Sequence, residues 1–142
     1  MWLFGKKDKD KSNKEKKSPK EVAFTMANNV FKNTLLDGEV IEHAIQGKGE
    51  AKNLIFSAGI LGATDKRLLY YFQDGSETGV ETIMYDKIVS ITNISGFEGK
   101  MGNFIGVAVE LANGRKRIVR CLDNDDQKKL INELIFYIES KR

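Results

Sequence analysis

The sequence predicts a mostly β domain of the α+β class, in which a helix precedes seven antiparallel strands and a second helix follows them. Two observations carry this prediction. Between about residues 37 and 122 the chain consists of short apolar runs, several of them alternating, with turn-forming residues between them. On either side of that region the apolar residues recur at helical spacing instead. Because an antiparallel sheet of this length tends to curl, we expect a barrel or a split sandwich that the last helix closes.

The first 18 residues predict a disordered tail. From Gly5 to Ser18 the chain contains no hydrophobic side chain and consists mostly of Lys, Asp, Glu, Ser and Asn. Burial cannot offset the entropy of ordering such a segment. We therefore expect residues 1–18 to form a disordered, lysine-rich tail.

A helix is predicted over residues 19–36. Ser18 suits its N-cap and Pro19 its first position, while Asp37 and Gly38 suit its end. Its apolar residues share one broad face and comprise Val22, Ala23, Met26, Ala27, Val30, Phe31 and Leu35.

Seven strands are expected in the middle of the chain. Alternation is clearest in the sixth, where Ile105, Val107 and Val109 point one way. The pair Asn113-Gly114 predicts a two-residue hairpin turn after that strand, because both positions tolerate positive φ. The expected strands cover residues 39–46, 54–63, 67–73, 79–85, 88–95, 103–112 and 115–122.

The chain ends in a second predicted helix, capped by Asp123 or Asn124. Acidic residues at its start and basic residues at its end suit the helix dipole. One arc is apolar and should pack on the strands; it comprises Leu130, Ile131, Leu134, Ile135, Tyr137 and Ile138. Phe136 falls outside this arc, among polar residues.

Size and charge limit the classes of function. A chain of 142 residues is most simply one domain with a core of its own. Its net charge of +3 is uneven, because the first 20 residues carry +5 and the other 122 carry −2. Strong nucleic-acid binding usually needs a basic face, so it is disfavoured for the folded part.

The sequence contains few candidate residues for catalysis or metal binding. Nucleophilic catalysis needs an activated Ser, Cys or Thr, and the single histidine, His43, is expected in the core or at its rim. The single cysteine, Cys121, is expected to be a buried small hydrophobe. One Cys and one His cannot form an internal disulfide or a Cys/His zinc site. We therefore expect no enzymatic activity, no catalytic residues, no cofactor and no metal.

The absence of a secretory signal, of an apolar run of about 20 residues and of a disulfide predicts a cytoplasmic protein. The tail adds a possible contact with the inner face of the cell membrane. Its candidate anchor residues are Trp2, Leu3, Phe4, Lys6 and Lys7, although interleaved carboxylates weaken the attraction to anionic lipid.

From about Asp37 to Arg142 the chain resembles the bacterial pleckstrin-homology-like (PH-like) domains, particularly the YokE-like group, and more distantly the GRAM domains. The resemblance covers about three quarters of the chain and is carried by LLDGEVIEHAI (35–45), GILGATDKRLLYYF (59–72), MYDKIVSI (84–91) and DNDDQKKLINELIFYI (123–138). It implies that residues 37–142 form a seven-stranded bent antiparallel barrel closed by a C-terminal helix. It also implies a module without known enzymatic activity.

In such a fold, Thr64–Arg67 is a tight corner between the second and third strands. We expect Arg67 to pair with Asp86 and so to hold two corners together; the alternative is that Lys66 and Arg67 contact a phosphate. Lys48 and Lys52 are further candidate contacts for an anion or a lipid headgroup. The lipid-binding pattern of pleckstrin domains is broken, however, because position 54 is a leucine.

Three apolar residues, Phe97, Met101 and Phe136, are candidate contacts with a protein partner. The alternative is that they pack back on the domain's own surface. The function that we expect is a non-enzymatic PH-like module that binds protein partners, self-associates through exposed strand edges, or both. The alternative is a peripheral membrane-binding module that uses the N-terminal residues and the loop lysines.

Overall fold

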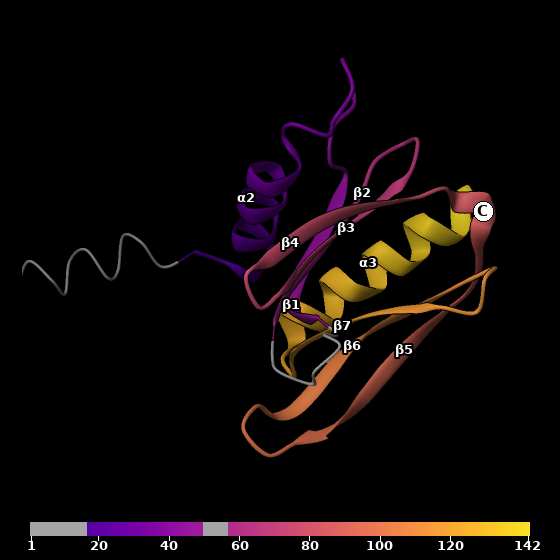
Figure 1. The fold of residues 1–142 in the computed structure, drawn as a ribbon. Coiled ribbons are helices and arrows are strands. Elements are labelled where there is room, and N and C mark those ends of the chain that lie inside the picture. Colours follow the sequence, from indigo (N-terminus) through magenta and orange to yellow (C-terminus); the bar gives the residue numbers. More distant parts are fainter. Residues whose placement is uncertain (1–16, 50–56) are drawn as a thin grey trace, which may run out of the picture.

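The computed structural model describes residues 17–49 and 57–142. The predicted tail, apart from its last two residues, lies outside the described residues, as do Lys52 and the start of the second predicted strand. The elements follow one another in the order α2 (Pro19–Phe31), β1 (His43–Gly49), β2 (Ser57–Ala63), β3 (Leu68–Asp74), β4 (Glu77–Ile83), η1 (Tyr85–Lys87), β5 (Ile88–Glu98), β6 (Gly102–Leu111), β7 (Lys116–Leu122) and α3 (Asp125–Lys141) (Figure 1).

The strands form one seven-stranded antiparallel sheet in the order β4-β3-β2-β1-β7-β6-β5. This confirms a mostly β architecture with two helices. The closed barrel is not confirmed, because β4 and β5 lie at opposite edges and no ladder joins them among the described residues.

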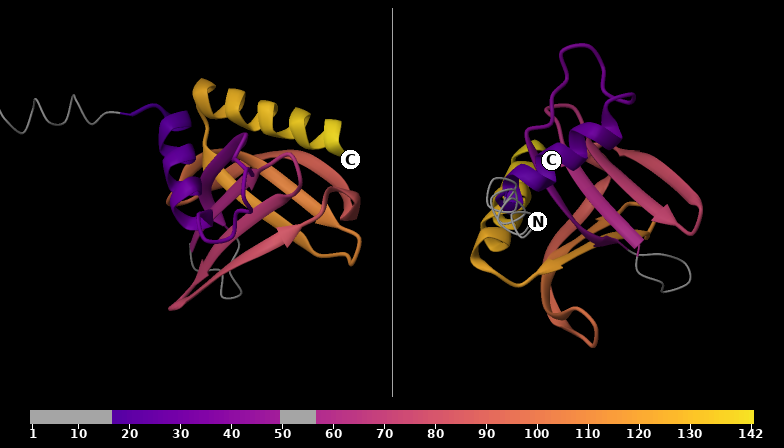
Figure 2. Two further views of the ribbon diagram at one scale, coloured as in Figure 1. Left: turned by 90° about the horizontal axis from the view of Figure 1, so that it is seen from above. Right: turned by 90° about the vertical axis from the view of Figure 1, so that its left-hand side faces the viewer.

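The sheet has two halves that meet at a short junction. Among the residues that the structure describes, β1 pairs with β7 at Lys48 with Arg120 and at Gly49 with Val119. We call β1–β4 the first half and β5–β7 the second half. The halves spread apart from the junction, and α3 lies between them (Figures 1 and 2).

The main core fills the space between the inner faces of the two halves and α3. Ile45 and Leu61 of the first half and Val107 and Val109 of the second half are buried there. The helix contributes the buried residues Leu130, Ile131, Leu134 and Ile138, as its predicted apolar arc requires.

A second, smaller core lies on the outer face of the first half, under α2. Phe31 and the small residues Ala23 and Ala27 of the helix pack on Ile60 and Leu69 of the sheet. Close approach is possible because β2 has Gly62 at this point: a Cβ there would lie 2.9 Å from Cε2 of Phe31. α2 therefore covers the outer face of the first half over β1, β2 and β3, whereas Val80 of β4 remains 38% exposed.

Both helix starts are confirmed. Ser18 and Glu21 form a capping box, with Pro19 at the first position, and Asn124 caps α3 by accepting from the backbone N–H of Gln127.

Several predicted boundaries are wrong: the fourth strand ends at Ile83 rather than residue 85, and the fifth ends at Glu98 rather than residue 95. α2 ends at Phe31 rather than Leu36, and β1 begins at His43 rather than residue 39. Side chains bind the backbone between them: Glu39 accepts from the N–H of Leu36, and the carbonyl of Thr34 accepts from Arg67. The turn after β6 is also longer than the predicted two residues: the strands stop at Leu111 and Lys116, and the N–H of Leu111 donates to the carbonyl of Arg115.

Candidate functional site

The corner at Thr64–Arg67 is a buried ion-pair network. The carboxylate of Glu39 is fully buried and accepts from Nη2 of Arg67 at 2.8 Å and from Nε at 3.0 Å. The hydroxyl of Thr64 donates to the same carboxylate at 2.6 Å. The partner of Arg67 is therefore Glu39 and not Asp86 as predicted; Asp86 lies on the exposed surface of η1.

The network holds four segments together. Arg67 also donates to the carbonyl of Thr34 after α2 and to the hydroxyl of Thr82 on β4. Tyr85 of η1 donates to the carbonyl of Thr64. Hydrogen bonds from Arg67 lower the pKa of Glu39 to about 2, and Glu39 in turn raises the pKa of Arg67. Arg67 is thus occupied by an internal carboxylate.

The described candidate contacts for an anion do not converge. Lys66 is exposed and lies 3.5 Å from Asp65 at the β2–β3 turn. Lys48 lies opposite Ala58 near the start of β2, whereas the turn follows Ala63 at its end. The length of β2 therefore separates the two lysines.

His43 and Cys121 have packing contacts. His43 lies at the rim of the core and contacts Tyr137, with the two rings tilted by 47° and their centroids 4.7 Å apart. Cys121 is buried beside the carbonyl of Gln46, and burial raises the pKa of its thiol to about 12. Among the residues that the structure describes, no three His, Cys, Asp or Glu side chains form a group that could hold a metal ion.

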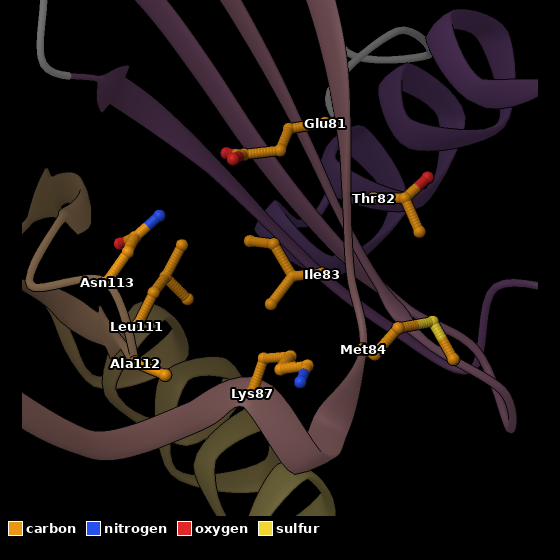
Figure 3. Close-up of a pocket in the computed structure, with 8 residues that line it drawn as sticks. All are labelled: Glu81, Thr82, Ile83, Met84, Lys87, Leu111, Ala112 and Asn113. Carbon is orange, nitrogen blue, oxygen red and sulfur yellow. The ribbon is translucent and has the colours of Figure 1, made fainter.

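A pocket lies where β4 faces the β6–β7 turn, with a volume of about 270 Å³ (Figure 3). Glu81, Ile83, Leu111 and Asn113 project toward it from the two sides, whereas Thr82 and Met84 point away. Glu81 is bound to Arg117 of β7, with Nη2 and Oε2 3.0 Å apart. This ion pair links the two halves of the sheet where strand pairing is absent, so a structural role accounts for the pocket's carboxylate.

The three candidate partner contacts lie on two different surfaces. Phe136 is 76% exposed and lies in a shallow groove on α3 that also has Lys20, His43 and Tyr137 in its walls. Phe97, 73% exposed, lies near the end of β5, and Met101 lies half-buried in the turn that joins β5 to β6. Glu98 fixes that turn by accepting from the backbone N–H groups of Lys100 and Met101.

Neither described helix covers the outer face of the second half (Figures 1 and 2). The strand register defines what this face presents. Arg120 lies between Lys48 of β1 and Gly106 of β6, and its guanidinium lies 5.4 Å from the ring centroid of Phe104. Leu122 is opposite Phe104 and is 56% exposed. Around Arg120 the face is therefore apolar and basic, whereas nearer the β6–β7 turn Lys116 lies opposite Glu110.

Sequence reasoning missed this basic face, although a signal was present. Four of the six residues from Arg115 to Arg120 are cationic. Alternation along a strand places Lys116 and Arg120 outward, while Arg117 turns inward to Glu81.

The outermost strand of the second half, β5, has a free edge. It has 11 residues, and the run from Val89 to Phe97 contains no charged side chain. At its start, Nη1 of Arg142 donates to the carbonyls of Ile88 and Val89; from Ser90 onward, no strand of residues 17–49 and 57–142 pairs with this edge. Edge strands usually carry charges or Pro that discourage pairing with another chain. β4, at the other edge, is shorter and carries Glu77 and Glu81.

Comparisons with known proteins bear on the fold alone. No family model matches the chain, and no curated protein matches it. Among solved structures, it is similar to the C-terminal domain of an unknown protein from Leishmania infantum, with a TM-score of 0.54 and 14% sequence identity. The likeness covers 82% of this chain and 94% of that one. Within residues 17–49 and 57–142, no helix has the length and apolarity to cross a membrane.

Proposed function

We propose that this chain is a non-enzymatic, PH-like interaction module that binds a protein segment as an additional strand beside β5. The observation that carries the proposal is the free edge of β5, uncharged from Val89 to Phe97. An extended segment gains main-chain hydrogen bonds by pairing with such an edge, and side-chain contacts on the flanking faces give specificity.

The surroundings of β5 favour protein binding. Phe97 lies near one end of the edge and is largely exposed, so it offers apolar area to a partner. Thr92 and Ile94 of β5 lie beside the uncovered outer face of β6, opposite Ala108 and Gly106. A segment paired with β5 could extend its contacts over these small residues.

The PH-like assignment rests on the resemblance in sequence and on the arrangement of elements. The order helix, seven antiparallel strands, helix agrees with the implied barrel. The Glu81–Arg117 ion pair spans the side on which a barrel would close. α3 contributes its apolar face to the core between the halves, as a closing helix would.

A displayed library of random peptides tests the proposal. We expect the full-length protein to select peptides of high β propensity, and backbone NMR shifts on binding to concentrate in β5. Thr92→Lys combined with Ser95→Lys should abolish this binding, because two cations at exposed edge positions oppose an additional strand. Thr78→Lys on the other edge strand is the matched control and should bind normally. Selection of no peptide, or of peptides that bind elsewhere, would refute the proposal.

The uncovered basic face favours a second candidate function, peripheral binding to anionic membranes. The register places Lys48 beside Arg120, with Lys116 on the same face. Each cation near an anionic surface contributes about 1 kcal/mol. Flotation with phosphatidylserine-containing vesicles should then depend on Lys116 and Arg120, and also on Trp2, Leu3 and Phe4 if the N-terminus inserts. Equal flotation of wild type and Lys116→Glu/Arg120→Glu would exclude this face as the membrane contact.

A further inference from the structure

We infer that the segment that pairs with β5 is the β5 strand of a second copy of this chain, in antiparallel orientation about a two-fold axis. The inference rests on the proposed function and names its partner. The first argument is electrostatic: no residue from Val89 to Phe97 is charged, so two copies of this strand approach without like-charge repulsion.

The charges at the two ends of β5 favour the antiparallel orientation. Lys87 and Arg142 lie at the start of the strand, and Glu98 lies at its end. Antiparallel pairing centred near Asn93 brings the basic end of each copy beside Glu98 of the second copy. Parallel pairing would instead place like charges together at both ends.

The other edge of the sheet limits the assembly to a dimer. Pairing of β5 with β4 of another copy would be heterologous and would build a closed ring or an open filament instead of a dimer. The shorter β4 strand carries Glu77 and Glu81, and the latter is held by Arg117, so this edge is charged where β5 is not. Pairing of β5 with β5 uses the β5 edge of each copy, so the assembly is complete as a dimer.

The length of the free edge suffices for a specific contact. From Ser90 to Phe97 it offers eight residues, about 26 Å of strand at about 3.3 Å per residue. Self-pairing also places the β-branched residues Ile91, Thr92 and Ile94 beside side chains of the second copy, and such cross-strand pairs stabilise sheets. The two second halves would then form one continuous sheet.

Sedimentation equilibrium of the full-length protein over a series of concentrations tests this inference. We expect a mass that rises with concentration toward twice the 16.0 kDa of one chain. Thr92→Lys/Ser95→Lys should remain a monomer with an unchanged urea midpoint at low concentration. Thr78→Lys should dimerise like the wild type. Hydrogen exchange of the wild type provides a readout without mutation, because the amides of β5 should become more protected as concentration rises.

Two outcomes would overturn the inference. One is a wild-type protein that stays at the mass of one chain at every concentration. The other is a dimer whose formation is unaffected by the β5 substitutions and whose β5 amides gain no protection. The proposed function fails separately: if the protein is a monomer but selected peptides still bind to β5, strand addition stands and only its partner is different.

Discussion

The two halves of the sheet differ in what covers them. The first half has the main core on its inner face and α2 on its outer face, where Phe31 is fully buried. The second half has the same core on its inner face, but its outer face retains the apolar and basic side chains of Phe104, Arg120 and Leu122 in contact with solvent. Among the described residues, a helix thus packs on both sides of the first half, whereas the outer face of the second half has no helix on it.

Polar interactions follow the same division. In the first half, the buried Glu39–Arg67 pair holds the segment after α2 against β3 and β4. In the second half, Arg142 donates to the carbonyls of Ile88 and Val89 at the start of β5, and Asn93 of β5 donates to Asn132 of α3 at an exposed position. The first half is therefore held by a buried ion pair, whereas the side-chain hydrogen bonds of β5 are at exposed or half-buried positions and, among the described residues, no strand pairs with its outer edge.

The largest expected difference between the two halves is in the free energy of unfolding lost when one apolar side chain of each is truncated. Phe31→Ala should lower the free energy of unfolding by about 3–5 kcal/mol, because it leaves a cavity between α2 and the sheet. Leu122→Ala, on the uncovered face, should change it by less than about 0.5 kcal/mol. Urea denaturation of dilute protein measures both values. Similar losses for the two variants would show that the second half is also covered in solution.

Acid should weaken the first half through Glu39. The pKa of this carboxyl is about 2 in the folded chain and near 4.5 without its partners. Between these values the folded state binds fewer protons than the unfolded state, so stability is present above about pH 4.5 and is lost as pH falls toward 2.

The matched variants are Glu39→Gln and, on the exposed surface, Glu42→Gln. Glu39→Gln should cost about 3 kcal/mol at neutral pH, because it leaves the Arg67 charge without its partner. It should also flatten the decline of stability with acid, measured by denaturation across the same pH range. If Glu39→Gln and Glu42→Gln behave alike, the ion pair does not hold the first half together.

A smaller effect is expected where α2 approaches the sheet. Gly62→Ala places a methyl group 2.9 Å from Cε2 of Phe31 and 3.2 Å from Cδ1 of Ile41. We expect a loss of about 1–3 kcal/mol by overpacking, with faster hydrogen exchange in α2 than in α3. Gly99→Ala in the β5–β6 turn meets no atom within 4 Å and should be close to neutral. A neutral Gly62→Ala variant would mean that α2 adjusts readily and covers the first half only loosely.

Most of the secondary structure could be predicted from local patterns. The caps at Ser18 and Asn124 are short-range signals, and the apolar arc of α3 is periodic. The boundaries near residues 32–42 could not be predicted, because the partners of that backbone include Arg67, 33 residues away from Thr34. The sequence suggested Asp86 as the partner of Arg67. The partner is Glu39 instead, because the segment after α2 folds back onto the β2–β3 turn.

The candidate site was predictable only in its components. Phe97 was predicted from the sequence as a candidate partner contact, and it is exposed near the end of β5. The uncharged run of β5 and the cations of β7 were visible in the sequence, but their significance depended on which strands lie at the edges. Phe136, by contrast, belongs to a separate groove on α3.

The sequence by itself determined which segments become helices and strands and which faces of the helices are apolar, because caps, turns and periodicity act over a few residues. Only the tertiary structure decided the strand order, the Glu39–Arg67 pairing and the exposure of β5 and the outer face of the second half. These features depend on contacts between segments far apart in the chain, where several pairings satisfy the same local pattern. The packing of α2 on the first half and of α3 between the halves selects one of these pairings.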